Sequence, residues 1–204
     1  MIRALSLSVA CGVLVAGATA GCASDPPPPP PPVPTFSSTS SSAATSTSSA
    51  PRLPSDCGSV ISTQNIDLAL GQPLVGRVRS IVGVPEPKIK RLERLTCQYG
   101  LPEAPPPGPA TVPLEISISR YADAASAAER LDDTIESERA RGAAPATVPV
   151  GPISGTVLTS ADRRLLVAAS GALTLAITLA PGFADDRVAD VLSDLGGQVL
   201  TAVT

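Results

Sequence analysis

A run of seven consecutive prolines, Pro26 to Pro32, is the feature that most constrains what this chain can fold into. Such a run forms an extended polyproline II helix, because each proline restricts its own φ and lacks an N–H donor. Residues 35–50, which follow, are almost entirely Ser, Thr and Ala, and bury too little apolar surface to offset the entropy lost on ordering. We therefore expect residues 23–54 to form a disordered tether and residues 55–204 to form a single domain.

Three roles for the tether stay open at this stage. It would act as a stiff spacer, as a Pro-rich docking motif, or as a carrier of O-linked sugars on its hydroxyls. Fully extended at about 3 Å per residue, it would reach on the order of 100 Å.

The first 21 residues have the proportions of an export signal. Arg3 supplies a positive charge, and residues 4–18 are uncharged, which is shorter than the roughly 20 apolar residues of a membrane span. Two cleavage sites compete. The segment Ala18-Thr19-Ala20 fits a secretory site that is cut after Ala20. Alternatively, Thr19-Ala20-Gly21-Cys22 resembles the lipobox of a bacterial lipoprotein, in which the cysteine becomes the lipid-carrying residue, although Thr19 stands where Leu, Val or Ile is usual.

The cysteine count favours lipidation of Cys22. The chain has four cysteines, and removal of the signal with Cys11 leaves an odd number. Acylation of Cys22, with chains such as palmitate, would leave Cys57 and Cys97 to form a disulfide in an oxidising compartment. In the chain-entropy estimate, closing that loop of about 40 residues stabilises the fold by roughly 4 kcal/mol. The pair lacks the C-x-x-C spacing of redox sites and supplies only half of a zinc shell.

Alternating apolar residues predict an α+β fold with an antiparallel sheet of about five strands and helices packed on one face. The expected order is α-β-β-α-β-β-β-α. It comprises short helices at 55–61 and 62–70, strands at 94–101 and 112–119, a helix after Asp123, strands at 153–159, 164–169 and 173–179, and a last helix capped by Asp185. Residues 72–93 give no regular pattern, and we interpret residues 143–152 as a flexible link.

Composition weighs against several function classes. A net charge of −3, and the absence of aromatic residues between the basic residues at 77–94, give no electrostatic or stacking basis for binding nucleic acid. The chain contains no His, the usual general base and metal ligand. Ser154 lacks the leading glycine of a G-x-S-x-G elbow. We therefore expect no catalytic residues, no metal site, no cofactor and no enzymatic activity.

One basic stretch is a candidate site for docking anions. It comprises Arg77, Arg79, Lys88, Lys90, Arg91 and Arg94. Such a stretch would bind anionic lipid headgroups, cell-wall polymers or an acidic partner, or it is simply a solvated loop. The sequence leaves both interpretations open.

The whole layout resembles the small cell-envelope lipoproteins of mycobacteria and related actinobacteria. The resemblance lies in Ala20-Gly21-Cys22, the Pro/Ser/Thr tether and the placement of Cys57 and Cys97. More loosely, the domain is similar to the extracellular sensor domains of actinobacterial receptor kinases. The resemblance implies a lipid anchor at the extracytoplasmic face of the cell membrane. There we expect a non-catalytic binding or accessory module whose partner is an envelope lipid, glycan or protein. A carrier of lipid or a small apolar ligand is the alternative, and a hydrolase without His is a more distant one.

Overall fold

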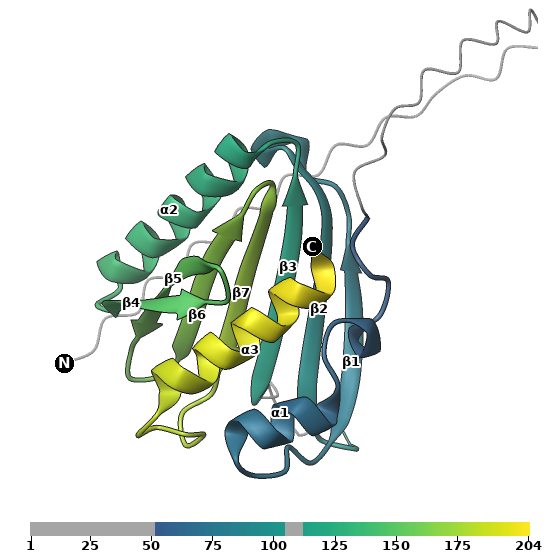
Figure 1. Ribbon diagram of the computed structural model, residues 1–204, viewed down its shortest axis with the longest axis vertical. Helices are drawn as coiled ribbons and strands as arrows, with labels where there is room; N and C mark the ends of the chain where they lie inside the picture. The colour runs from purple at the N-terminus through teal and green to yellow at the C-terminus, as the bar shows by residue number, and fades with distance from the viewer. Residues whose placement is uncertain (1–51, 105–111) are drawn as a thin grey trace, which may run out of the picture. The chain divides into compact units, whose positions relative to one another are not determined.

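Seven antiparallel strands form one sheet, in the order β1-β2-β3-β7-β6-β5-β4, in the computed structural model of the chain (Figure 1). The structure describes residues 52–104 and 112–204. The predicted signal, Cys22 and nearly all of the predicted tether lie outside these residues. The strands are β1 Arg77–Gly83, β2 Arg91–Leu101, β3 Leu114–Tyr121, β4 Ala144–Val150, β5 Ile153–Thr159, β6 Arg164–Ser170 and β7 Leu173–Leu179.

The prediction of about five strands was wrong, and the two strands it missed are the two edges of the sheet. β1 has exposed residues at six of its seven positions, so its sequence shows no alternation between a buried and an exposed face. β4 contains Pro145 and Pro149, which read as loop residues. Proline is tolerated on an edge strand at positions where the N–H would point away from the neighbouring strand. No ladder hydrogen bond is lost there.

The prediction that the helices pack on one face was also wrong, because they cover both faces. The helical segments are the 3-10 turns η1 Cys57–Ser59 and η2 Pro87–Ile89, and the helices α1 Thr63–Leu70, α2 Ala124–Ala140 and α3 Val188–Val203. On β6, Leu166 belongs to the core cluster beneath α1 and α3. Its neighbours Leu165 and Val167 form a second cluster with residues of α2. Successive strand residues point to opposite faces, so α2 lies on the side away from α1 and α3.

The predicted helices at 62–70 and after Asp123 are confirmed, whereas the predicted helix at 55–61 is only the 3-10 turn η1, which Asp56 caps. The Asp123 carboxylate accepts a hydrogen bond from the Ser126 amide at 2.7 Å and caps α2. Ser62 caps α1, and Gly71 ends that helix with a φ of 72°. Asp185 does not cap α3, which begins three residues later; its carboxylate instead accepts a hydrogen bond from the Gly182 amide.

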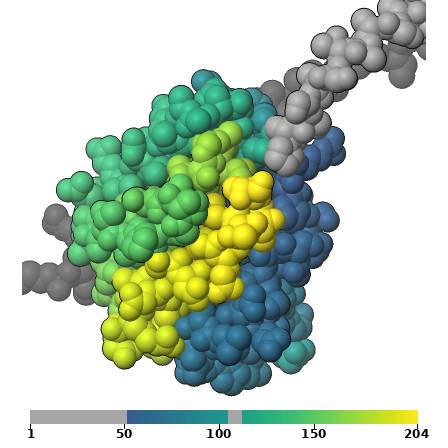
Figure 2. All heavy atoms as spheres, viewed as in Figure 1, coloured from purple at the N-terminus to yellow at the C-terminus, as the bar shows by residue number. Residues whose placement is uncertain are grey.

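Helix α3 lies close against the sheet, between α1 and the β4–β5 hairpin (Figure 2). A Cβ atom placed on Gly196 would come within 2.7 Å of a Val150 methyl carbon and 2.8 Å of a Leu166 methyl carbon. Such an approach is possible only for glycine. This interface is filled by protein atoms, so it gives no support to a carrier that would hold a lipid between sheet and helix.

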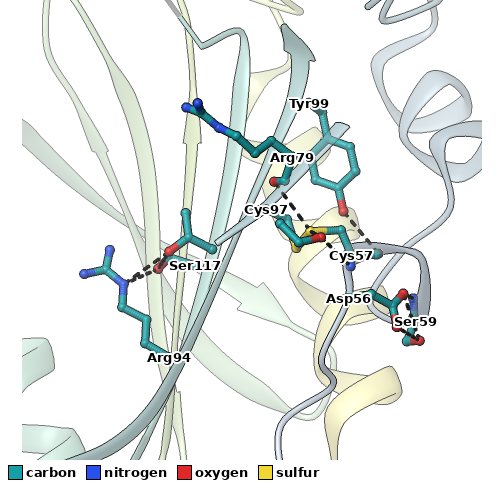
Figure 3. The surroundings of a disulfide bond; sticks show 10 residues. Asp56, Cys57, Ser59, Arg79, Arg94, Cys97, Tyr99 and Ser117 are labelled. Carbon is teal, nitrogen blue, oxygen red and sulfur yellow. Dashed lines mark hydrogen bonds between the residues drawn. A yellow bond between two sulfur atoms is a disulfide. The ribbon is translucent and has the colours of Figure 1, made fainter. Parts of the chain in front are cut away.

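The predicted disulfide between Cys57 and Cys97 is confirmed, with the two Cα atoms 5.5 Å apart (Figure 3). It joins η1 to the centre of β2. The hydroxyl of Ser80 donates to Cys57 Sγ at 2.9 Å, and the Tyr99 hydroxyl donates to the Cys57 carbonyl at 3.4 Å. Burial raises the pKa of Tyr99 to about 12, so this phenol stays protonated and remains a donor at physiological pH.

Within residues 52–104 and 112–204, no helix combines the length and the apolar character needed to cross a bilayer.

Candidate anion-binding site

The face of β2 and β3 that points away from the disulfide is polar. Arg94 and Ser117 lie on this face, on the opposite side of the sheet from Cys57 and Tyr99 (Figure 3). Cross-strand partners share a face, and the register pairs Arg94 with Ser119 and Thr96 with Ser117. Continuing across β3, Ser119 pairs with Thr174 of β7. A line of guanidinium and hydroxyl groups therefore crosses three neighbouring strands.

Thr96, Gln98 and Ser117 on this face are buried, and each is hydrogen-bonded to neighbouring polar side chains. The hydroxyls of Thr96 and Ser117 are 3.0 Å apart, and Arg94 Nε donates to both, at 3.2 Å and 3.0 Å. One rung along, Gln98 donates to Glu115 at 2.7 Å and accepts from Arg79 Nε at 2.9 Å. Buried polar groups cost free energy unless they are paired, so this network fixes the side chains that form the floor of the site.

A β-bulge brings Arg91 to the same face as Arg94. These arginines are three positions apart, and in a regular strand an odd spacing places two side chains on opposite faces. The register shifts between Arg91 and Glu93, and Arg91 pairs with Tyr121, whereas Arg94 pairs with Ser119. Tyr121 and Ser119 are two residues apart and share a face. The extra residue, Leu92, absorbs the shift, as bulges near functional sites commonly do.

The two arginines line a hollow of about 140 Å³ together with Arg130 of α2. Five hydroxyl side chains and one alanine complete its wall: Ser117, Ser119, Tyr121, Thr134, Thr174 and Ala176. None of the described residues that line it is acidic. We call this hollow the arginine pocket. Guanidinium and hydroxyl donors around a small volume form a site for an oxyanion such as phosphate or carboxylate.

The described residues do not use every donor of the three arginines. Arg91 Nε is buried and makes no hydrogen bond to any described residue. Arg130 pairs with Asp133 at 3.6 Å, but both side chains are about half exposed, so water screens that ion pair. Arg94 keeps its Nη groups free of any hydrogen bond to a described residue. The pocket therefore retains donors that a bound anion would satisfy.

The structure divides the six basic residues predicted as one stretch. Only Arg91 and Arg94 lie together in the arginine pocket. Lys88 lies in η2 and Lys90 follows it, and both line a neighbouring hollow beside acidic side chains of α2. Lys90 is also 3.9 Å from the Asp123 carboxylate. Arg77 begins β1, opposite the far end of β2, and donates to the Pro102 carbonyl. Arg79 is bound to Gln98. The stretch does not form one continuous docking surface.

Sequence reasoning missed the contributions of α2 and β7 to the site. Arg130 and Thr134 lie one helical turn apart on α2, and the helical period of the sequence places Arg130 away from the apolar stripe. Thr174 occupies one of the polar positions of β7, in which apolar and polar residues alternate. The available signal was the hydroxyl side chains at alternate positions of two strands, namely Ser117, Ser119 and Thr174. A sheet face that only packs against a helix would carry apolar side chains at these positions.

No group of His, Cys, Asp and Glu side chains that could hold a metal ion occurs among the described residues. No protein-family model matches the chain, and no curated protein sequence matches it.

Proposed function

We propose that this chain is a lipid-anchored protein at the extracytoplasmic face of a cell membrane, and that its domain is a non-catalytic module that binds an anionic group of an envelope component in the arginine pocket. The convergence of Arg91, Arg94 and Arg130 on a hollow that no described acidic residue lines carries the binding part of the proposal. A hydrogen bond between a guanidinium group and an anionic oxygen contributes about 1.5–3 kcal/mol.

The size of the arginine pocket limits the part of the ligand that it holds. About 140 Å³ accommodates a few water molecules, at roughly 30 Å³ each in the liquid, or a single phosphate- or carboxylate-sized group. An acyl chain would not fit. The ligand would therefore be an anionic headgroup or a charged substituent of a glycan, with the rest of the molecule outside the pocket.

The binding proposal is tested by titrating the full chain, in a non-ionic detergent, with inorganic phosphate while the arginine Nε–H resonances are followed by NMR. We expect a saturable shift of the Arg91 resonance. The Arg94→Gln variant should bind at least tenfold more weakly, equivalent to about 1.4 kcal/mol. Arg139→Gln removes an exposed arginine at the end of the same helix α2 and serves as the matched control. Equal weakening by both variants would show general electrostatics, and no saturable shift would reject the site.

The source of the anion is distinguished by comparing acetate, inorganic phosphate and vesicles of phosphatidylglycerol or phosphatidylcholine. Preference for phosphatidylglycerol vesicles that is lost in Arg91→Gln and Arg94→Gln would identify a lipid headgroup. Preference for free phosphate or acetate, with no vesicle binding, would indicate a soluble or glycan-borne group. Arg91→Lys keeps the charge but removes the Nε–H, so it separates hydrogen bonding from charge alone.

The anchoring part of the proposal rests on Cys22 and has its own test. We expect Cys22→Ala to move the exported protein from the membrane fraction to the soluble fraction, because two acyl chains on one cysteine give stable anchoring. A membrane-bound Cys22→Ala protein would contradict the lipid anchor without affecting the binding proposal.

A further inference from the structure

The two edges of the sheet differ in how they resist pairing with another strand. Pro145 and Pro149 of β4 are four positions apart, on the same side of the strand. Two of its seven residues therefore cannot donate a backbone hydrogen bond. β1 contains no proline. Its arginines do not guard the edge, because Arg77 binds the Pro102 carbonyl and Arg79 binds Gln98 on the neighbouring strand. Natural proteins normally block such an edge with proline, charge or a bulge. The register shift between β1 and β2 lies between Arg77 and Arg79, before the regular segment that ends at Gly83.

Exposed apolar side chains gather at the unblocked edge. Seven large apolar residues are exposed in the described part of the chain, and five of them lie between residues 75 and 84, namely Val75, Val78, Ile81, Val82 and Val84. Val82 is 69% exposed and Val84 is 76% exposed. No strand within residues 52–104 and 112–204 pairs with the outer side of β1. An edge of this kind is a template for strand addition.

We propose that β1 pairs antiparallel with β1 of a second copy of this chain, with the two-fold axis at Ile81. The register of β1 on β2 is regular from Arg79 to Gly83, and Ile81 is the centre of that segment. When two identical strands pair antiparallel about one residue, residues at equal distances from that residue lie opposite each other. Backbone groups that point outward on one copy then meet outward-pointing groups on the other, as the ladder hydrogen bonds require. The result is an isologous dimer with a continuous sheet.

The side chains agree with this register. Ile81 would lie opposite Ile81 of the second copy, and Val78 would lie opposite Val84. Arg79 would face Gly83, which has no side chain to clash with it. The two Arg79 residues would be four positions apart, about 13 Å at roughly 3.3 Å per residue, which exceeds the Debye length of about 8 Å at physiological salt. A parallel pair would place these arginines side by side.

The second copy is favoured over an unrelated peptide because the segment is self-complementary. Antiparallel pairing covers the unblocked edge of both copies at once and leaves the proline-bearing β4 edges at the two ends, so assembly stops at two. A membrane anchor on each tether would raise the effective concentration of one copy near another. The edge pairing itself does not depend on the proposed ligand.

Site-specific crosslinking of the full chain in its own membrane tests the pairing directly. Ile81→Cys places a thiol on the proposed axis, where opposing Cβ atoms of a strand pair are about 5 Å apart and within reach of a short bis-maleimide. Thr147→Cys is the matched control, since Thr147 is exposed at the centre of the other edge strand. We expect a crosslinked dimer for Ile81→Cys only, above the background of the unsubstituted chain. Equal crosslinking of both variants, or none, would overturn the proposal.

A second measurement covers the case in which the new cysteine perturbs β1. The mass of the full chain in detergent is followed by sedimentation over a hundredfold range of concentration. Val82→Lys should weaken dimerisation at least tenfold, whereas Leu68→Lys, which replaces a similarly exposed residue on α1, should leave it unchanged. A wild-type chain that is monomeric throughout, or a Val82→Lys chain that dimerises like Leu68→Lys, would contradict the pairing and would favour a heterologous strand at this edge.

Discussion

At the scale of single residues, charged side chains in this domain are held by specific partners. Glu93 accepts hydrogen bonds from Arg120 Nη2 at 2.8 Å and from Arg120 Nε at 3.2 Å, and also from the Leu53 amide at 3.0 Å. The two side chains are 30% and 18% exposed. The Arg120 hydrogen bond is the main cause that lowers the pKa of Glu93, with the Leu53 amide adding to it against the cost of burial. This carboxylate ties the first described residues of the chain to β2 and β3.

We predict that Glu93→Gln lowers the free energy of unfolding by about 1 kcal/mol at pH 7, because it removes a charge-assisted hydrogen bond. The folded pKa lies below the ordinary value of 4.5, so the contribution is complete above that pH and is lost as the pH falls through the folded pKa. Urea unfolding of both proteins between pH 7 and pH 2.5 should show the difference shrinking toward acid. Glu136→Gln, at an exposed position of α2, is the control, and a constant difference across this range would contradict the prediction.

At the scale of elements, α3 shows how a helix and a sheet can require glycine. Its apolar stripe of Val191, Leu192, Leu195 and Val199 is buried as the helical spacing predicts. Gly196 and Gly197 suggest from sequence alone a weak point at the centre of the helix. In the structure Gly196 is buried beneath the methyl groups of Val150 and Leu166. Its role is therefore close packing.

We predict that Gly196→Ala destabilises the domain by about 1–3 kcal/mol, since the added methyl group overpacks the interface. Helix propensity alone predicts the opposite sign, a gain of about 1 kcal/mol. Gly197→Ala is the matched comparison, because a Cβ placed there would first meet the Gly151 amide nitrogen at 3.3 Å, a milder contact than those of Gly196. Denaturant unfolding of both variants measures the difference. A Gly196→Ala protein as stable as the wild type would show that sheet and helix separate without cost.

At the scale of the whole domain, the segment before the sheet is attached by the disulfide. Residues 52–62 contain only one turn of 3-10 helix, and Val60 and Ile61 join Cys57 in the core. A short segment of this kind makes few regular hydrogen bonds of its own. The covalent link to β2 holds it on the face that α1 and α3 also cover.

We predict that replacing both Cys57 and Cys97 by alanine lowers the free energy of unfolding by about 2–4 kcal/mol. Guanidinium unfolding with and without reductant measures this loss. Reductant should destabilise the wild-type chain by a similar amount and leave the double variant unchanged. If thiol labelling finds both cysteines free in the exported protein, the disulfide does not form in the cell and the prediction fails.

Several features follow from the sequence alone because they depend on local patterns. The strands at Leu95–Leu101 and Leu173–Leu179 alternate apolar and polar residues, and the two faces of the sheet impose that period directly. Ser62, Asp123 and Gly71 mark helix ends because capping involves only neighbouring backbone groups. The disulfide partners follow from the count of cysteines, once the predicted export signal is removed and Cys22 is assigned to lipidation.

Other features were decided only by the tertiary structure. The edge strands β1 and β4 could not be predicted, because a strand with one neighbour and little burial need not alternate or exclude proline. The side of the sheet that α2 covers depends on how the chain passes from β3 through α2 to β4, and no local sequence pattern specifies that path. Arg91 and Arg94 share a face only because the partner strand imposes a bulge at Leu92. The arginine pocket needs that bulge together with Arg130 from a distant helix, since a binding site depends on contacts between residues far apart in the sequence.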